Sequence, residues 1–101
     1  MATKNFGKNR TFLNPNDKTC LGAVYWEVIV YYDRKEGECS IDANIGMNRD
    51  AQYHYVSKSK DLKAIDIMQA ELNKFKQACL CAEEWCRKEG LKFNKMSKWS
   101  L

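Results

Sequence analysis

The sequence predicts an α+β domain, in which a three-stranded antiparallel β-sheet meander is followed by one long α-helix packed on one face. Two observations carry this prediction. Apolar residues between positions 22 and 57 recur with the two-residue period of β-strands. From about 59 to 89 the apolar period becomes helical, and this stretch contains no proline or glycine.

Outside this region the chain is expected to form irregular basic ends. Residues 1–21 contain turn chemistry in "NPNDK", with the only proline of the chain, and carry four basic side chains against one acidic side chain. Residues 91–101 carry three lysines and no acidic residue. We therefore predict an irregular N-terminal arm over 1–21, a single α+β domain over 22–90 and a basic-aromatic C-terminal tail over 91–101.

The composition is that of a small globular protein. Of its 101 residues, 45% are hydrophobic and 30% charged, which suffices for one modest core and is too apolar for a disordered chain. The first residues, "MATKNFGKNRTF", contain no apolar signal segment, and the longest apolar run, "GAVYWEVIVYY", is too short to span a bilayer. We therefore expect a cytoplasmic protein with no membrane partner, in the host cell cytoplasm if it is phage-encoded.

The first strand is predicted over about 22–32, where β-branched and aromatic residues dominate. Both of its faces are largely apolar, which predicts a central strand. One face carries Val24, Trp26, Val28, Val30 and Tyr32. If this face packs on the helix, the opposite face presents Tyr25, Ile29 and Tyr31 for binding. The alternative is that the N-terminal arm covers that face with Phe6, Phe12 and Leu13.

The next two strands follow polar turns. The segment "DRKEGE" at 33–38 predicts a hairpin loop in which Gly37 takes a positive φ. The second strand, about 38–46, alternates cleanly, with Cys39, Ile41, Ala43 and Ile45 facing the core. After "MNRDA", the segment "QYHYV" predicts a short third strand over about 52–57.

The long helix is predicted over about 59–89, with Ser59 as its N-cap and Gly90 as its C′ residue. Its core stripe consists of Leu62, Ile65, Met68, Leu72, Phe75, Cys79, Ala82 and Cys86. Within "CLCAEEWC", Cys79 and Cys86 share this stripe about 10 Å apart, too far for a disulfide, and Cys81 lies on the other side of the helix. Such splayed thiols favour core packing, so no metal and no cofactor is predicted.

The length of this helix predicts that part of its surface contacts something other than the sheet. About 30 residues would span about 45 Å, whereas a compact domain of this size is about 33 Å across. Either the helix breaks near "NKFKQA" or its end projects, with Leu80, Cys81 and Trp85 off the core stripe. Three alternatives then stay open for this surface. A protein partner binds it, the C-terminal tail covers it, or the chain forms a homodimer through the helix.

The sequence carries no motif typical of an enzyme. Its one histidine, His54, lies between two tyrosines in "QYHYV", a setting more typical of a strand surface than of a catalytic base. The five glycines are scattered and form no phosphate-binding loop. We therefore expect a non-enzymatic protein with no catalytic residues.

Two basic segments predict nucleic-acid contact as an alternative. In "LKFNKMSKWSL", lysines interleave with Phe93 and Trp99, which suits base stacking and phosphate neutralisation, although a short strand fits the same pattern. The segment "SKSKDLK" at 57–63 places further lysines at the start of the helix. The lysines of the two segments are Lys58, Lys60, Lys63, Lys92, Lys95 and Lys98.

The segment at 57–63 resembles the strand-to-helix junction of double-stranded RNA-binding domains, and three strands followed by a helix also resemble small integrase-type DNA-binding modules. The chain departs from both families. It lacks a predicted leading helix and the glycine-containing lysine motif of the RNA-binding family, and its predicted helix is much longer than either family uses. Membership of neither family is inferred.

The function predicted from these features is that of a small non-enzymatic module that binds a protein partner. Short, lysine- and asparagine-rich single domains without catalytic motifs are typical of phage or mobile-element accessory proteins that inhibit a host protein by occupying its surface. The predicted partner-binding residues are Tyr25, Ile29, Tyr31, Leu80, Cys81, Trp85, Phe93 and Trp99. The alternative is a nucleic-acid-binding module that uses the lysines at the helix start and in the C-terminal tail.

Overall fold

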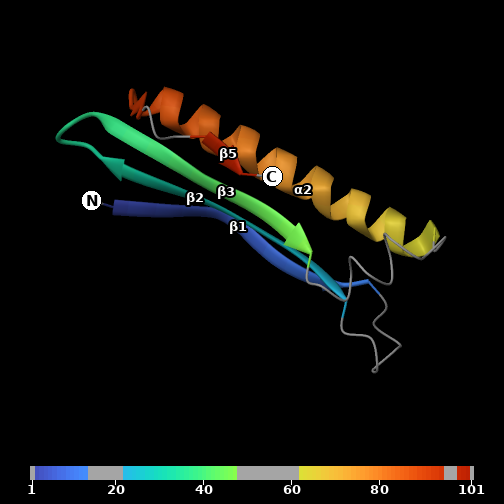
Figure 1. Ribbon diagram of the computed structural model, residues 1–101. Helices are drawn as coiled ribbons and strands as arrows, with labels where there is room; N and C mark the ends of the chain where they lie inside the picture. Colours follow the sequence, from blue (N-terminus) through green and yellow to red (C-terminus); the bar gives the residue numbers. More distant parts are fainter. Residues whose placement is uncertain (1, 14–21, 48–61, 95–97, 101) are drawn as a thin grey trace.

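The computed structural model describes residues 2–13, 22–47, 62–94 and 98–100. In chain order the elements are β1 (Ala2–Phe12), β2 (Ala23–Asp33), β3 (Glu38–Met47), α2 (Leu62–Lys88), β4 (Lys92–Phe93) and β5 (Lys98–Ser100). Figure 1 shows two layers, with α2 lying along one face of the sheet. The predicted α+β class, an antiparallel meander with one long helix packed on it, is confirmed.

The meander consists of β1, β2 and β3, with β2 in the centre. The prediction of an irregular N-terminal arm is therefore wrong for residues 2–12, which pair with β2 from end to end. The sequence concealed this strand because it is an edge strand, mostly exposed and carrying three basic residues, as edge strands commonly do. The strand predicted over 52–57 and the predicted Ser59 N-cap lie outside the described residues.

A β-bulge also interrupts the two-residue period of inward- and outward-facing side chains in β1. The pairing of β1 with β2 shifts by one residue between Asn5 and Gly7, so Phe6 is the extra residue. Phe6 packs against the main core cluster. Gly7 has a φ of 143°, and a Cβ at this position would lie 2.9 Å from the ring of Trp26. Glycine therefore allows the Trp26 ring to lie against the backbone of β1.

The β2–β3 hairpin forms as predicted. Asp33 Oδ1 accepts hydrogen bonds from the backbone amides of Lys35, at 3.0 Å, and Glu36, at 3.2 Å. Gly37 has the predicted positive φ, at 68°. The resulting register turns one face of β2 toward α2, and its buried residues are Val24, Trp26, Val28 and Val30.

The C-terminal end of α2 is a Schellman motif. Gly90 has a φ of 70°, its amide donates to the carbonyl of Arg87 at 3.1 Å, and the Leu91 amide donates to the carbonyl of Cys86 at 3.0 Å. These contacts confirm Gly90 as the C′ residue. The motif reverses the chain, so that the buried side chain of Leu91 caps the core at this end.

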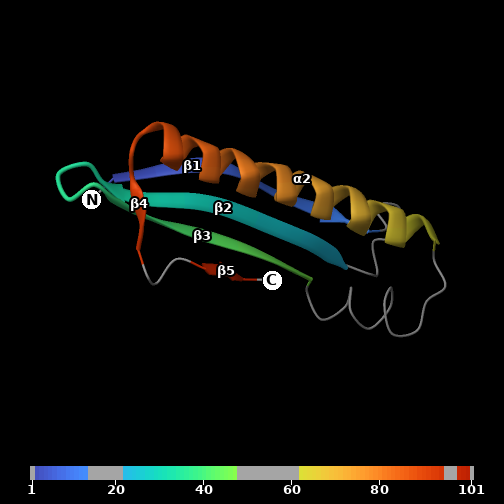
Figure 2. The same cartoon turned by 90° about the horizontal axis from the view of Figure 1, so that it is seen from above.

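Beyond this turn, β4 and β5 lie along the edge of β3 that faces away from β2, as Figure 2 shows. Both β4 and β5 pair with β3 in parallel. The Lys92 amide donates to the Gly37 carbonyl and the Asn94 amide to the Cys39 carbonyl, each at 2.8 Å. The prediction of an irregular basic end is therefore wrong for the residues of β4 and β5, because backbone groups of β3 were available to pair with them.

The helix α2 is continuous over 27 residues, which excludes a break near "NKFKQA". It matches its sheet in length because each meander strand has 10 or 11 residues. The molecule is accordingly elongated, with extents of 50 × 20 × 18 Å, and not the compact body on which the expectation of a projecting helix was based.

The buried face of α2 follows the predicted stripe from Phe75 onward, and Met68 is partly buried against the cluster of Leu13, Val24 and Ala64. Buried as predicted are Phe75, Cys79, Ala82 and Cys86. The prediction is wrong for Ile65 and Leu72, which are 40% and 48% exposed, and Ala64 and Glu71 are buried instead. Successive helical residues lie about 100° apart, so burying position 71 turns position 72 toward solvent. A buried glutamate is rare enough that the sequence pattern favoured the leucine.

Replacing Gly7 with alanine is expected to lower the free energy of unfolding by about 3 kcal/mol, because the new Cβ would overlap the Trp26 ring at an unfavourable φ. The matched control is Gly37→Ala, which also has a positive φ but no atom within 4 Å, and should cost only about 1 kcal/mol. Urea denaturation of both variants measures the difference. Equal losses would show that the Trp26 ring does not lie against β1.

Candidate functional site

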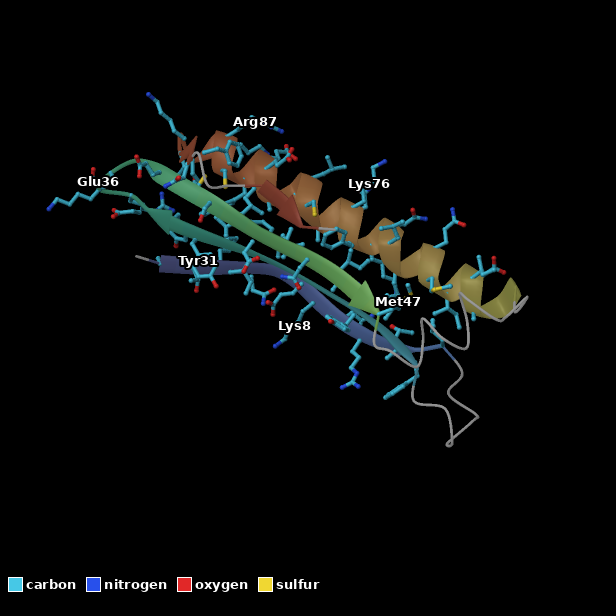
Figure 3. The ribbon with its side chains drawn as sticks, in the orientation of Figure 1. Lys8, Tyr31, Glu36, Met47, Lys76 and Arg87 are labelled. Atoms are coloured by element: carbon cyan, nitrogen blue, oxygen red, sulfur yellow. The ribbon has the colours of Figure 1, made fainter. Side chains whose placement is uncertain are left out.

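The predicted residues of β2 form one row on the face of the sheet opposite α2. Tyr25 is 46% exposed, and Ile29 and Tyr31 are half-buried. Figure 3 shows Tyr31 and Lys8 on the side of the sheet away from the helix. We call this surface the open sheet face.

Of the N-terminal residues that were the alternative cover for this face, Phe6 and Leu13 lie elsewhere, whereas Phe12 pairs with Ala23 on this face. Phe6 packs in the main core, and Leu13 packs with Val24 and Ala64 in a second, smaller cluster. Phe12 is 43% exposed, with the guanidinium carbon of Arg10 5.5 Å from the centre of its ring. The strand β1 therefore widens the sheet instead of covering it.

The open sheet face carries both signs of charge. A shallow hollow of about 550 Å³ is lined by Lys8, Asn9, Arg10, Tyr25, Trp26, Glu27 and Asn44. In this hollow the ring of Tyr25 lies over Gly46, where a Cβ would meet its hydroxyl at 3.1 Å. Lys8 pairs in register with Glu27, and Asp42 pairs with Ile29 on the next strand. The basic edge of this face is thus accompanied by carboxylates.

Trp85 contacts other parts of its own chain. Its ring lies 5.9 Å from that of Phe6 and 5.1 Å from that of Tyr32, both edge-to-face. Lys4 Nζ lies 5.6 Å from the ring centre and the guanidinium carbon of Arg34 lies 5.9 Å from it. These contacts, at the interface of α2 with β1 and β2, engage the Trp85 ring within its own chain, whereas Leu80 and Cys81 are exposed.

A second surface lies along α2, and we call it the α2 groove. It is lined by Leu72, Asn73, Phe75, Lys76, Cys79, Leu80 and Glu83, with a volume of about 470 Å³. Leu72 and Leu80 are 48% and 47% exposed, whereas Phe75 and Cys79 are core residues. Sequence reasoning identified Leu80 but assigned Leu72 to the core. The exposed positions are large apolar residues on a well-formed helix, a feature typical of protein-binding surfaces.

The orientation of α2 is set by Glu71, whose side chain is buried between the layers. Its Oε1 atom accepts hydrogen bonds from Asn9 Nδ2 at 2.6 Å and from Trp26 Nε1 at 3.2 Å. Its Oε2 atom accepts from Lys74 Nζ at 2.8 Å. One carboxylate thus joins α2 to β1 and β2, because each strand supplies a donor to it. Sequence reasoning missed this residue, since its partners are distant in the chain.

The ionised form of Glu71 is stabilised in this setting. Burial alone acts to raise its pKa, but the hydrogen bonds from Lys74, Asn9 and Trp26 and the charge of Lys74 outweigh burial, so its pKa is lowered from the ordinary 4.5. The carboxylate and the buried indole of Trp26 satisfy one another, with further donors from Asn9 and Lys74. This arrangement is typical of a structural polar network.

The cysteines are placed as predicted. Cys79 and Cys86 are buried free thiols, and Cys81 is exposed. Burial, with a smaller effect of Glu83, raises the pKa of Cys79 to about 11. Burial and a hydrogen bond with the thiol of Cys39 raise the pKa of Cys86. The thiols of Cys79 and Cys86 are therefore protonated at neutral pH, as core residues are.

Several predicted contact residues lie at the margins of the described chain. Phe93 is 43% exposed in β4, and Lys92 beside it is exposed. Trp99 pairs in register with Ala43 in β5, between Lys98 and Ser100. Outside the described residues lie His54, Lys58, Lys60 and Lys95. Lys63 belongs to the first turn of α2.

Among the described residues, no group of three or more His, Cys, Asp or Glu side chains could hold a metal ion. No helix in the described part of the chain is both long enough and apolar enough to cross a membrane. Comparisons with protein-family models, curated proteins and solved structures found no match to this chain. Its function is therefore inferred from its own surfaces.

Replacing Glu71 with leucine is expected to lower the free energy of unfolding by roughly 3 kcal/mol at neutral pH, because the buried indole of Trp26 and the part-buried amide of Asn9 lose their acceptor. Glu71→Gln keeps an acceptor oxygen and should cost roughly 1–2 kcal/mol. Lys74→Ala is the control, and because its side chain is 59% exposed it should cost less than about 1 kcal/mol. Denaturant titration of the three variants checks this order.

The contribution of Glu71 to the free energy of unfolding is expected to depend on pH. Since its folded pKa lies below the ordinary 4.5, the stabilisation is complete above that pH and is lost as pH falls through the lowered pKa. The difference in unfolding free energy between the wild type and Glu71→Gln should therefore shrink below about pH 4.5. A difference that stays constant down to pH 2 would contradict an ionised Glu71.

Proposed function

We propose that the chain is a non-enzymatic module that binds a protein partner through the α2 groove. The observation that carries the proposal is the pair Leu72 and Leu80, two large apolar side chains each close to half exposed beside core residues. Apolar grooves of this kind accept side chains from a partner and release water on binding. The polar groups at its rim, Asn73, Lys76 and Glu83, can orient that partner.

The groove is anchored to the core of the described fold. Glu71, one position from Leu72, ties α2 to both β1 and β2. Phe75 and Cys79, which line the floor of the groove, are themselves held in the core. A surface fixed in this way loses little conformational entropy on binding, which favours affinity.

Nucleic acid is the alternative partner, and the open sheet face supports it through Lys8, Arg10 and Tyr25. The same face also carries Glu27 and Asp42, whose negative charges oppose phosphate. We therefore favour a protein partner.

A photo-crosslinking residue placed at Leu80 tests the proposal in cells that make the chain. Benzoylphenylalanine at this position is expected to yield one discrete protein adduct, because the side chain borders the groove. The matched control is Gln77, an exposed position on the same helix that does not line the groove. Adding Leu72→Asp should reduce the Leu80 adduct at least tenfold, which corresponds to about 1.4 kcal/mol of binding energy.

Equal protein adducts from positions 80 and 77 would contradict a partner in the groove. So would nuclease-sensitive complexes that dissociate with salt and disappear in Lys8→Ala or Arg10→Ala, because these would assign binding to the open sheet face. The mass of the adduct identifies its partner. An adduct with any protein at position 80 but not at position 77, whether another protein or a second copy of this chain, supports the proposed function.

A further inference from the structure

We propose that the occupant of the α2 groove is the α2 helix of a second copy of this chain, packed antiparallel about a two-fold axis. The inference rests on the proposed protein-binding role of the groove and names its partner. It starts from the charges of the groove. The charged residues that line it are Lys76 and Glu83, which have opposite signs, and the lining residues between them are Cys79 and Leu80.

The spacing of these residues suits a two-fold axis. Lys76 and Glu83 are seven residues apart, so they lie on the same side of α2 about 10.5 Å apart along its axis. The midpoint falls between Cys79 and Leu80, at the apolar centre of the groove. An antiparallel copy centred there sets each Lys76 against Glu83 of the other copy, and each Leu80 against Cys79 of the other copy.

Other arrangements of the two helices are less favourable. A parallel pair would set Lys76 against Lys76 and Glu83 against Glu83, which is repulsive in both places. In the antiparallel pair, Leu72 lies opposite Arg87, whose aliphatic stem can cover a leucine while its charged end stays in water. Arg87 is 65% exposed and lies 3.9 Å from Glu83 of its own chain, so Glu83 would lie between two cations.

Figure 3 shows Lys76 and Arg87 projecting from α2 away from the sheet. The contact between residues 72 and 87 covers only about 22 Å of helix. The area that it buries is therefore expected to be smaller than the roughly 800 Å² on each partner of a standard interface. The dimer is therefore expected to be reversible and to depend on protein concentration.

Charge reversal tests the arrangement by sedimentation velocity. Lys76→Glu or Glu83→Lys alone should weaken the dimer at least tenfold, because each change creates two like-charge pairs across the axis. Mixing these two variants should restore a heterodimer to within about threefold of the wild type, since both pairs then regain opposite signs. The control is Glu84→Lys, the same charge change at an exposed position outside the groove, which should leave dimerisation unchanged.

Circular dichroism of each variant verifies that it is folded before its mass is compared. A wild-type chain that stays monomeric at millimolar concentration would overturn the homodimer but leave the proposed protein-binding function to the crosslinking result. A dimer that is unaffected by either single reversal, or single variants that do not recover when mixed, would also overturn the antiparallel α2 pair.

Discussion

The carboxylate of Glu71 is the interaction on which the arrangement of this domain depends. It lies between the two layers and accepts hydrogen bonds from a side chain of β1, a side chain of β2 and a lysine of its own helix. An ionised group in such a place is tolerated only when its acceptor sites are filled, so the three donors and the carboxylate require one another. The position of β1 and the rotation of α2 are therefore fixed together.

The surface of α2 follows from that rotation. With position 71 buried, Leu72 is turned outward, and Leu80, about two helical turns further along α2, borders the same groove. The bulge at Phe6 has a related effect on the other layer, since it sends that ring into the core beside Trp85. Trp85, which the sequence predicted to bind a partner, thus contacts its own chain. Leu72, which the sequence assigned to the core, is available to a partner.

The sequence predicted what depends on local period and turn chemistry. The apolar alternation of β2 and β3, the Gly37 hairpin, the Gly90 cap and the buried Cys79 and Cys86 all appear in the structure. It did not predict β1, because a bulged and basic edge strand has no alternation to detect. The sequence did not predict the burial of Glu71 either, because the partner of Glu71, Asn9, is 62 residues away and the charge of a glutamate argues against burial. The site was accordingly identified in part, through Leu80 but without Leu72, Lys76 or Glu83.

The most direct test of this account is hydroxyl-radical footprinting of α2 over a range of protein concentrations, read residue by residue by mass spectrometry. In dilute solution Leu72 and Leu80 should be oxidised readily and Phe75 protected, because Glu71 holds the helix in its observed rotation. At concentrations where the chain pairs with itself, Leu80 should become protected and Lys76→Glu should abolish that protection. Protection of Leu72 at every concentration, with Phe75 oxidised, would contradict the rotation of α2 and with it the proposed groove.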